Sequence, residues 1–535
     1  MRVLLILLLG ILPLILPRGA AAQQAASPQI MQDVKSGDWN DALALAQATG
    51  DPLMVKLVTF FQLLCPGGGT PDEIQSFISA NPDWPEQGLL ALRQQQAAGT
   101  YAPSFGPAQD PFLAQVQTLH ASGNDSGAAA LWLTQGKAAA AAAAPDARLL
   151  YWPAQDQLAR ALLAAGDAKD AYQVVIAVDP PIAGATARGQ IADRDFLAGF
   201  LLLRFLKQPA EATTWFTDLA SSSTAVITQA RAYYWRARSE SGPAAQADYA
   251  SAANYPDTYY GQLAAMALGD TPDALAARIL NAPEPGFSAE DALNFAVMEL
   301  PRAAALLTQM QDPDDAQIFL NRLGVVAADD RTRELAAKLA LGLGYPQSAV
   351  SVARSAGIAG QMLIREGWPM PVSPPPGLET AVTFGIMRQE SSFYAGAVSG
   401  AGAVGLMQLM PETARRTAAK NGIPFGGDLT DPDVNMALGT AYFNGLLESF
   451  GDCLPLAIAA YNAGPTNVAN WLAENGDPEM GASVAGGADL IDWVEEIPFS
   501  ETRNYVQRVT ESIVIYRALQ TGHADNPLSR WMQSS

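Results

Sequence analysis

The feature that most constrains the fold is a long segment, from about Ala25 to Ala359, that is dominated by Ala, Leu, Gln and Arg. These residues favour helices, and turn signals such as Gly50-Asp51-Pro52 recur between helix-length stretches. Alternating β-branched runs joined by Asn-Gly turns are nearly absent. The segment therefore predicts a mainly α structure in which short helical hairpins stack into a superhelix. No strict repeat period is visible, so we expect a degenerate solenoid.

A proline-rich segment, Trp368 to Gly377, interrupts this pattern. Prolines at this density cannot lie inside a helix, so a new domain begins here. A chain of 535 residues is also too long for a single hydrophobic core. We predict a superhelical domain over residues 23–245, a helical linker domain over 246–370 and a separate C-terminal domain over 371–535.

The first residues have the pattern of a secretory signal peptide. Arg2 precedes an uncharged, mostly apolar run from Val3 to Leu16, and three alanines stand before Gln23. The run is shorter than the roughly 20 residues that a membrane-spanning helix needs, and no cysteine follows it to carry a lipid. We predict that residues 1–22 are a signal peptide and that the mature protein is exported and soluble. The alternative is a retained N-terminal anchor.

Composition excludes some partners and cofactors. The chain has 32 Lys and Arg against 53 Asp and Glu, and this net charge of -21 opposes the binding of nucleic acid. Its two histidines, His120 and His523, are too few for a histidine-rich metal site. Cys65 and Cys453 are far apart in sequence, and we expect free thiols there although a disulfide would be permitted. We therefore expect no metal and no cofactor.

Aromatic residues gather in two helical segments, at Tyr233-Tyr234-Trp235 and at Tyr259-Tyr260. Aromatic side chains at helical spacing belong to a core more often than to a ligand site. We predict that these residues are core.

Glu390 is the strongest candidate for a catalytic group. The residues before it are typical of a helix, with Val382, Ile386 and Glu390 on one inward stripe. Serines and glycines follow at once, so the helix ends at Glu390. Burial and the carbonyl end of the helix both disfavour a negative charge, which predicts a raised pKa suited to a general acid. The alternative is a glutamate at the end of an ordinary surface helix.

A glycine-rich segment, Gly400 to Gly405, matches the dinucleotide pattern G-x-G-x-x-G. That pattern binds a dinucleotide only when a buried strand precedes it, and Phe393 to Ser399 is not such a strand. We reject a nucleotide cofactor. The glycines instead predict tight turns or a close approach of the backbone to a ligand.

Four blocks in the C-terminal part resemble a known family in sequence, order and spacing. They are RQES at 388–391, SGAGAVGLMQLMP at 399–411, AYNAG at 460–464 and EEIPFSETRNYV at 495–506. With these blocks the chain resembles the soluble lytic transglycosylases, which have a goose-lysozyme-like catalytic domain. The resemblance is tight from about Leu378 to Leu519 and diffuse before that, where Trp235 and Tyr259-Tyr260-Gly261 look like the family's superhelix. It implies a ring-like superhelix followed by a lysozyme-like catalytic domain, in the periplasm.

The resemblance also implies a mechanism in which Glu390 is the single catalytic acid/base. Glu390 would protonate the glycosidic oxygen between N-acetylmuramic acid and N-acetylglucosamine in peptidoglycan. It would then remove the proton of the muramoyl 6-hydroxyl, which attacks its own anomeric carbon and gives a 1,6-anhydro product. Because this attack is intramolecular, a second catalytic carboxylate is not required.

The resemblance also implies which residues bind the substrate. Ser391 would form a hydrogen bond near the scissile sugar, while Met407 and Gln408 would line the cleft.

The remaining carried-over residues come from the last two blocks. Tyr461 would place its hydroxyl close to Glu390, and Asn462 would support that region. Glu495 would contact the sugar from the opposite side, and Tyr505 would belong to the same wall.

Two other functions stay open at this point. A lysozyme-type muramidase of the same fold would need a further acidic residue to position water, and the stretch after Glu390 carries none before Glu412. A non-enzymatic scaffold could use the superhelix to bind proteins. We expect peptidoglycan glycan strands as the partner, with proteins of cell-wall synthesis or turnover as further partners, and a monomeric chain.

Overall fold

The computed structural model describes residues 20–101, 110–182, 184–481 and 486–529, without the side chains of 20–27 and 185. Within these ranges the secondary structure is helical, apart from turns and three isolated β-bridges. The predicted mainly α fold is confirmed. The predicted signal peptide, residues 1–22, lies almost wholly outside the described residues.

The chain forms two compact units, each assembled from separate stretches of sequence. Unit 1 combines residues 1–104, 284–356 and 363–369. Its helices are α2 (Ala20–Ser36), α3 (Trp39–Ala48), α4 (Pro52–Leu64), α5 (Pro71–Ala80), α6 (Gln87–Ala97), α18 (Ala289–Val297), α19 (Glu299–Gln309), α20 (Pro313–Val326), α21 (Asp330–Gly342), α22 (Pro346–Ile358) and α23 (Ile364–Gly367).

Unit 2 combines residues 105–283, 357–362 and 370–535. Its first helices are α7 (Pro111–Ala121), α8 (Asp125–Ala142), α9 (Pro145–Arg148), α10 (Tyr151–Ala164), α11 (Ala168–Val175), α12 (Ala185–Arg204), α13 (Pro209–Ser222), α14 (Val226–Ser239), α15 (Gly242–Ala252), α16 (Tyr259–Ala267) and α17 (Pro272–Leu280). Its C-terminal helices are α24 (Thr380–Glu390), α25 (Pro411–Asn421), α26 (Pro432–Ser449), α27 (Leu454–Ala463), α28 (Pro465–Asn475), the 3₁₀ helix η1 (Pro478–Met480), α29 (Leu490–Glu496) and α30 (Ser500–Thr521).

Helix starts follow a local rule that the sequence shows directly. Asp51, Asp110 and Asp431 each precede a proline, and each carboxylate accepts a hydrogen bond from a backbone N–H in the first turn of α4, α7 or α26. Proline at the first helical position has no N–H to leave unpaired, and the aspartate satisfies donors that follow it. Asp-Pro pairs therefore fix where these helices begin.

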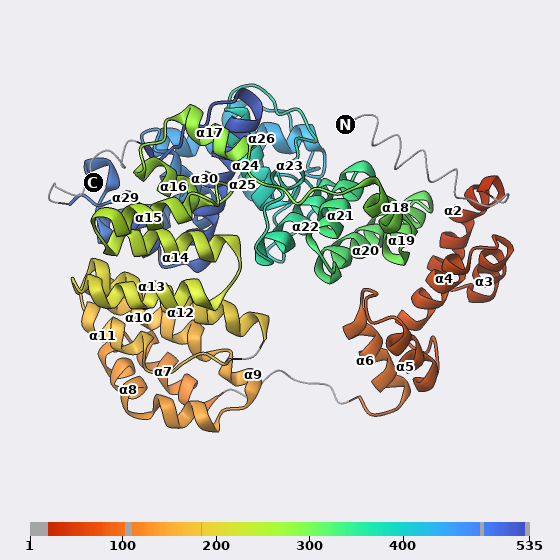
Figure 1. The fold of residues 1–535 in the computed structure, drawn as a ribbon, viewed down its shortest axis with the longest axis horizontal. Helices are drawn as coiled ribbons and strands as arrows, with labels where there is room; N and C mark the ends of the chain where they lie inside the picture. The colour runs from red at the N-terminus through yellow and green to blue at the C-terminus, as the bar shows by residue number, and fades with distance from the viewer. Residues whose placement is uncertain (1–19, 102–109, 183, 482–485, 530–535) are drawn as a thin grey trace. The chain divides into compact units, whose positions relative to one another are not determined.

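The superhelical part of unit 2 is a stack in which α12, α13 and α14 lie side by side (Figure 1). Its core is aromatic. Trp235 is 0% exposed and lies edge-on to Phe200, with ring centroids 5.2 Å apart. Gly199 allows the close packing, because a Cβ there would lie 2.6 Å from the ring of Phe216. The prediction that these aromatics are core is confirmed for Tyr234, Trp235, Tyr259 and Tyr260, which are at most 1% exposed, whereas Tyr233 is only partly buried.

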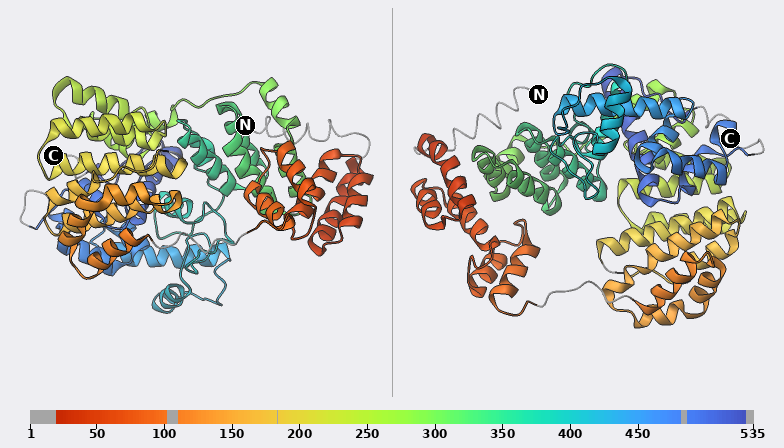
Figure 2. Two further views of the ribbon diagram at one scale, coloured as in Figure 1. Left: turned by 90° about the horizontal axis from the view of Figure 1, so that it is seen from below. Right: turned by 180° about the vertical axis from the view of Figure 1, so that it is seen from behind.

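The C-terminal part of unit 2, cyan to blue in Figure 2, is built around α24 and α30, which pack directly on each other. Gly385 in α24 makes this approach possible, because a Cβ there would lie 3.1 Å from Ile513 and 3.3 Å from the carbonyl of Val509. Helix α30 also packs on α16 and α17 of the superhelical part. The end of α24 is thereby placed against the start of α30.

Neither cysteine forms a disulfide within the described residues, and Cys453 is buried while Cys65 is partly buried. No described helix has the length and apolar character to span a bilayer.

Candidate active site

Glu390 is the last residue of α24, as predicted, and Val382 and Ile386 on the same stripe are 2% and 0% exposed. The glutamate side chain is half-buried. Burial raises the pKa of its carboxyl to about 7; a hydrogen bond from Tyr505 works against this shift, and the charge of Glu501 adds to it. Both protonation states are therefore populated near neutral pH, as an acid/base requires.

Tyr505 makes the direct contact with Glu390. It is 4% exposed in α30, and its hydroxyl donates to Oε1 of Glu390 at 2.6 Å. Burial, followed by the charge of Glu390, raises the pKa of the tyrosine well above its ordinary value, so the hydroxyl stays a donor. The resemblance implied a place for Tyr505 on the wall of the cleft, and in the structure Tyr505 contacts the acid directly.

Tyr461 lies close to Glu390, but its hydroxyl donates its hydrogen bond to another group. Its hydroxyl donates to the carbonyl of Met407 at 2.7 Å. Its ring packs against Tyr442 and Phe443, with centroids 5.5 and 5.9 Å away. Burial and then the charge of Glu390 raise the pKa of Tyr461, so the two groups are within electrostatic reach. Tyr461 thus joins the second block of sequence to the site.

The loop after α24 is tied together by side chains of the first two blocks. The hydroxyl of Ser391 accepts from the N–H of Phe393 at 3.1 Å and lies 2.8 Å from the carbonyl of Leu406. The amide of Gln408 donates to the carbonyls of Ala397 and Gly405 at 3.0 and 2.8 Å. These contacts hold the loop folded beside Glu390.

Asn435 of α26 holds the same loop through hydrogen bonds to its backbone. Its Oδ1 accepts from the N–H of Met407 at 2.8 Å, and its Nδ2 donates to the carbonyl of Val404 at 2.9 Å. The Met407 side chain is 0% exposed and packs against Gly439, where an added Cβ would overlap the sulfur of Met407. This differs from the expectation that Met407 lines the cleft, because the side chain is enclosed and only its backbone takes part in the site.

Asn462 connects the third block to the start of α30. It donates to Glu501 at 3.3 Å and accepts from the hydroxyl of Thr502 at 2.5 Å. Glu501 is exposed, and it is the carboxylate whose charge raises the pKa of Glu390. No role was predicted for Glu501 from the sequence, although its position four residues before Tyr505 puts both on one face of a helix.

Comparisons with known proteins find matches to this part of the chain. Residues 375–482 match the family model described as the transglycosylase SLT domain. This match assigns residues 375–482, and not the whole chain, to the SLT domain family. The matched residues contain Glu390 and the first three blocks, whereas Glu501 and Tyr505 follow the matched part of the SLT domain.

Curated relatives match about a quarter of this chain. The soluble lytic murein transglycosylase of Escherichia coli (strain K12) is 42% identical over 135 residues, which are 25% of this chain and 20% of that protein. The aligned part of the chain thus spans about a fifth of the length of that relative.

Solved structures match nearly the whole chain. A lytic transglycosylase Slt from Pseudomonas aeruginosa, an inactive mutant, has a TM-score of 0.55 and 23% identity and covers 94% of this chain and 82% of its own. The 70 kDa soluble lytic transglycosylase of Escherichia coli has a TM-score of 0.50 and 18% identity, covering 95% and 98%. At this identity the likeness shows the fold alone. The predicted fold class, a helical superhelix with a lysozyme-like domain, is confirmed.

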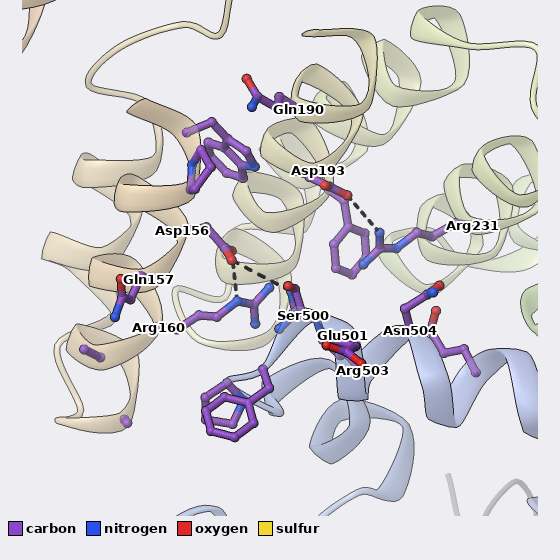
Figure 3. A pocket seen from close by; sticks show the side chains of 18 of the residues that line it. Asp156, Gln157, Arg160, Gln190, Asp193, Arg231, Ser500, Glu501, Arg503 and Asn504 are labelled. Atoms are coloured by element: carbon purple, nitrogen blue, oxygen red, sulfur yellow. Dashed lines mark hydrogen bonds and ion pairs between the residues drawn. The ribbon is translucent and has the colours of Figure 1, made fainter. Parts of the chain in front are cut away.

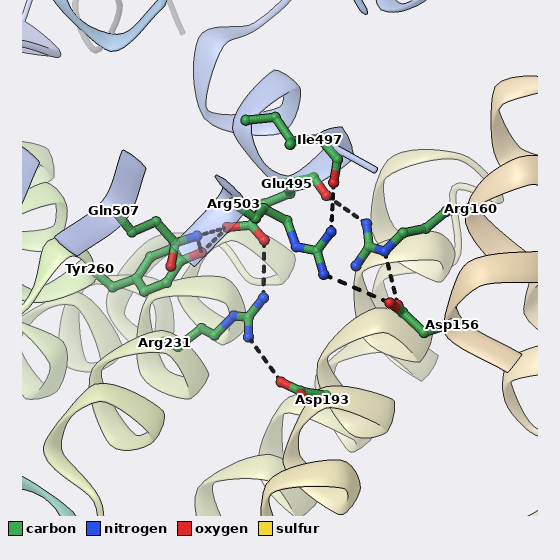
Figure 4. Close-up of polar contacts among 9 residues, drawn as sticks. All are labelled: Asp156, Arg160, Asp193, Arg231, Tyr260, Glu495, Ile497, Arg503 and Gln507. Carbon is green, nitrogen blue, oxygen red and sulfur yellow. Dashed lines mark hydrogen bonds and ion pairs between the residues drawn. The ribbon is translucent and has the colours of Figure 1, made fainter. Parts of the chain in front are cut away.

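Glu495 lies in a cluster of polar side chains from several helices (Figure 4). It is 1% exposed, and its carboxylate accepts from Arg231 at 3.0 Å, from Gln507 at 2.8 Å and from Tyr260. The expected contact with a sugar is not available, because the carboxylate is enclosed and its oxygens are taken by protein donors. Arg231 precedes Glu495 by 264 residues, so no local pattern around the SLT domain indicated this pair.

A cavity of about 850 Å³ lies beside the start of α30 (Figure 3). Asp156 and Arg160 of α10, Asp193 of α12 and Arg231 of α14 line it together with Glu501. Because Glu501 also contacts Asn462 of the third block, the cavity borders the candidate active site of the SLT domain.

The described residues contain no group of three or more His, Cys, Asp or Glu placed to hold a metal ion. His120 and His523 instead contact Asp125 and Asp273, at 2.6 and 2.7 Å. The glycine-rich segment 400–405 belongs to the loop after α24 and follows no strand.

Proposed function

We propose that this protein is a lytic transglycosylase that cleaves the β-1,4 bond between N-acetylmuramic acid and N-acetylglucosamine in peptidoglycan and leaves 1,6-anhydromuramoyl ends. The observation that carries the proposal is Glu390, a half-buried carboxyl with a pKa of about 7, held by one hydrogen bond from Tyr505. Such a group can give a proton to a glycosidic oxygen and take one back from a sugar hydroxyl in the same turnover. The family of the C-terminal part and the names of the relatives support the same reaction.

The other residues would prepare the site for the sugar. Ser391 and Gln408 would shape the loop beside Glu390, while Asn462 and the exposed Glu501 would offer polar groups to sugar hydroxyls. The muramoyl 6-hydroxyl is the nucleophile, so its effective concentration at the anomeric carbon is set within the sugar. Tyr461, whose hydroxyl dipole lies close to Glu390, would help to stabilise the positive charge that develops on the sugar.

Glu501 supports a second candidate function, that of a muramidase in which water attacks the sugar. It is a second carboxylate near Glu390, and glycosidases that hydrolyse commonly use two. Both reactions use Glu390 as the acid. They differ in whether water or the 6-hydroxyl attacks the anomeric carbon.

Mass spectrometry of digested peptidoglycan separates the two reactions. We expect products with anhydromuramoyl ends, whereas products heavier by one water would assign the hydrolase. The Glu390→Gln variant should lose turnover by at least about a hundredfold while still binding glycan strands. Full activity in that variant would remove Glu390 as the acid and refute the proposal.

The location and the partners are part of the same proposal. The protein would act in the periplasm after export through residues 1–22, on glycan strands and as a monomer, alone or with proteins of cell-wall turnover. The division into domains at residues 23–245, 246–370 and 371–535 stays a prediction. Cell fractionation with N-terminal sequencing of the mature chain tests the export step.

A further inference from the structure

The corner between α29 and α30 is held by three arginines from different helices (Figure 4). Arg160 donates to the carbonyl of Glu495 at 2.8 Å, and Arg503 donates to the carbonyl of Ile497 at 2.6 Å. Arg231 donates to the carboxylate of Glu495 at 3.0 Å. Carbonyls at the end of a helix lack partners within it and carry partial negative charge, so guanidinium groups stabilise them. The turn that leads into α30 is therefore fixed by the superhelical part of unit 2.

The Glu495 carboxylate joins the elements that meet at this corner. One oxygen accepts from Arg231 of α14, and the other accepts from Gln507 of α30 and from Tyr260 of α16. Gln507 and Tyr260 are 7% and 1% exposed, so the cluster is shielded from water. Hydrogen bonds to a buried charge are directional and costly to leave unmade.

Gln507 lies two residues after Tyr505 in α30, so a displacement of this part of the helix moves both side chains. The Tyr505–Glu390 contact of 2.6 Å depends on where this turn of α30 lies. We propose that Glu495 is a positioning residue, which binds Gln507 and so fixes the turn of α30 that presents Tyr505 to Glu390. This inference rests on the proposed function, in which Glu390 is the acid.

Glu495 does not act on Glu390 through its own charge. The groups that face Glu390 are Tyr505 and Glu501 of α30 and Tyr461 of α27. A change in the titration of Glu390 after substitution of Glu495 must therefore come from a change in the position of α30.

The test is the Glu495→Gln variant of the full-length protein, which removes the charge and keeps the size of the side chain. We expect kcat to fall on the order of tenfold to a hundredfold because Tyr505 no longer orients the acid. KM should stay unchanged because position 495 is enclosed. Loss of the Tyr505 hydrogen bond, which lowers the pKa of Glu390, should move the alkaline limb of the pH–rate profile upward by about one unit.

Three variants control the interpretation. Glu496→Gln replaces the adjacent carboxylate, which interacts with Arg204 and Arg160, and should leave the profile unchanged. Gln507→Leu breaks the link to α30 without touching Glu495 and should reproduce the shift, which keeps the proposal testable if Glu495→Gln folds poorly. In a Tyr505→Phe background, Glu495→Gln should add no further shift.

The proposal is overturned if Glu495→Gln and Gln507→Leu keep the wild-type profile, even when their melting temperatures fall, since that marks a purely structural role. Carbon NMR titration of the Glu390 carboxyl gives the same readout without turnover. If the wild-type chain proves inactive on peptidoglycan, that titration still decides whether Glu495 positions Tyr505.

Discussion

Glu390 has to be buried enough to hold a proton near neutral pH and exposed enough to give it to a sugar oxygen. Its half-buried position at the end of α24 meets both needs, and burial outweighs the hydrogen bond from Tyr505 in setting a pKa of about 7. Because the acid acts first in its protonated form, kcat/KM should fall as the pH rises through about 7. A pH–rate profile on purified peptidoglycan measures this, and an alkaline limb below about pH 5, near the ordinary value for a glutamate, would contradict it.

For single residues, the sequence predicted the features that depend on neighbouring residues in the chain. It did not predict the features that depend on contacts between distant segments. The helix end at Glu390 and its raised pKa followed from a stripe of apolar residues and the serines after it. The partners of the tyrosines did not follow, because the hydroxyl of Tyr505 reaches Glu390 across 115 residues of chain and that of Tyr461 reaches Met407 across 54. Glu495 was expected at the sugar because resemblance gives a residue type and a position, but not its burial.

Among the elements, the loop after α24 depends most strongly on a single glycine. Gly405 has φ +86°, and a Cβ there would lie 2.2 Å from Nδ2 of Asn435 and 2.3 Å from the carbonyl of Leu429. The Gly405→Ala variant should therefore lower the free energy of unfolding by about 3 kcal/mol through backbone strain and overlap. It should also lower activity, because Asn435 could no longer hold the loop beside Glu390.

Gly400→Ala is the matched control in the same loop, since a Cβ at Gly400 meets nothing within 4 Å. Urea unfolding of both variants measures the difference. Equal stability of the two would show that the loop adapts and that the contact with Asn435 is not required. The sequence predicted tight turns from the glycines, but it could not separate Gly405 from Gly400, because the distinction comes from α26.

On the scale of the whole molecule, unit 2 joins the SLT domain to helices that precede it by hundreds of residues. Buried polar groups cross this boundary: Arg204 binds Asp492, and the N–H of Tyr259 donates to Glu511 at 2.9 Å. A buried carboxylate that loses its partner is strongly destabilising. The proline-rich segment before it predicted a separate C-terminal domain, but such a boundary says nothing of charges that are satisfied from elsewhere in the chain.

Residues 370–535 expressed alone should therefore be less stable than in the full-length chain and much less active. Without α14 and α16, Glu495 loses Arg231 and Tyr260, and the turn into α30 is no longer fixed. Thermal unfolding and peptidoglycan digestion of the fragment and the full chain, side by side, measure both effects. Adding Glu495→Gln to the fragment should lower the melting temperature and the activity by less than it does in the full chain, because the contacts that give the carboxylate its role are already gone. A fragment that melts and digests like the full chain would show that the helices before it contribute nothing to the site.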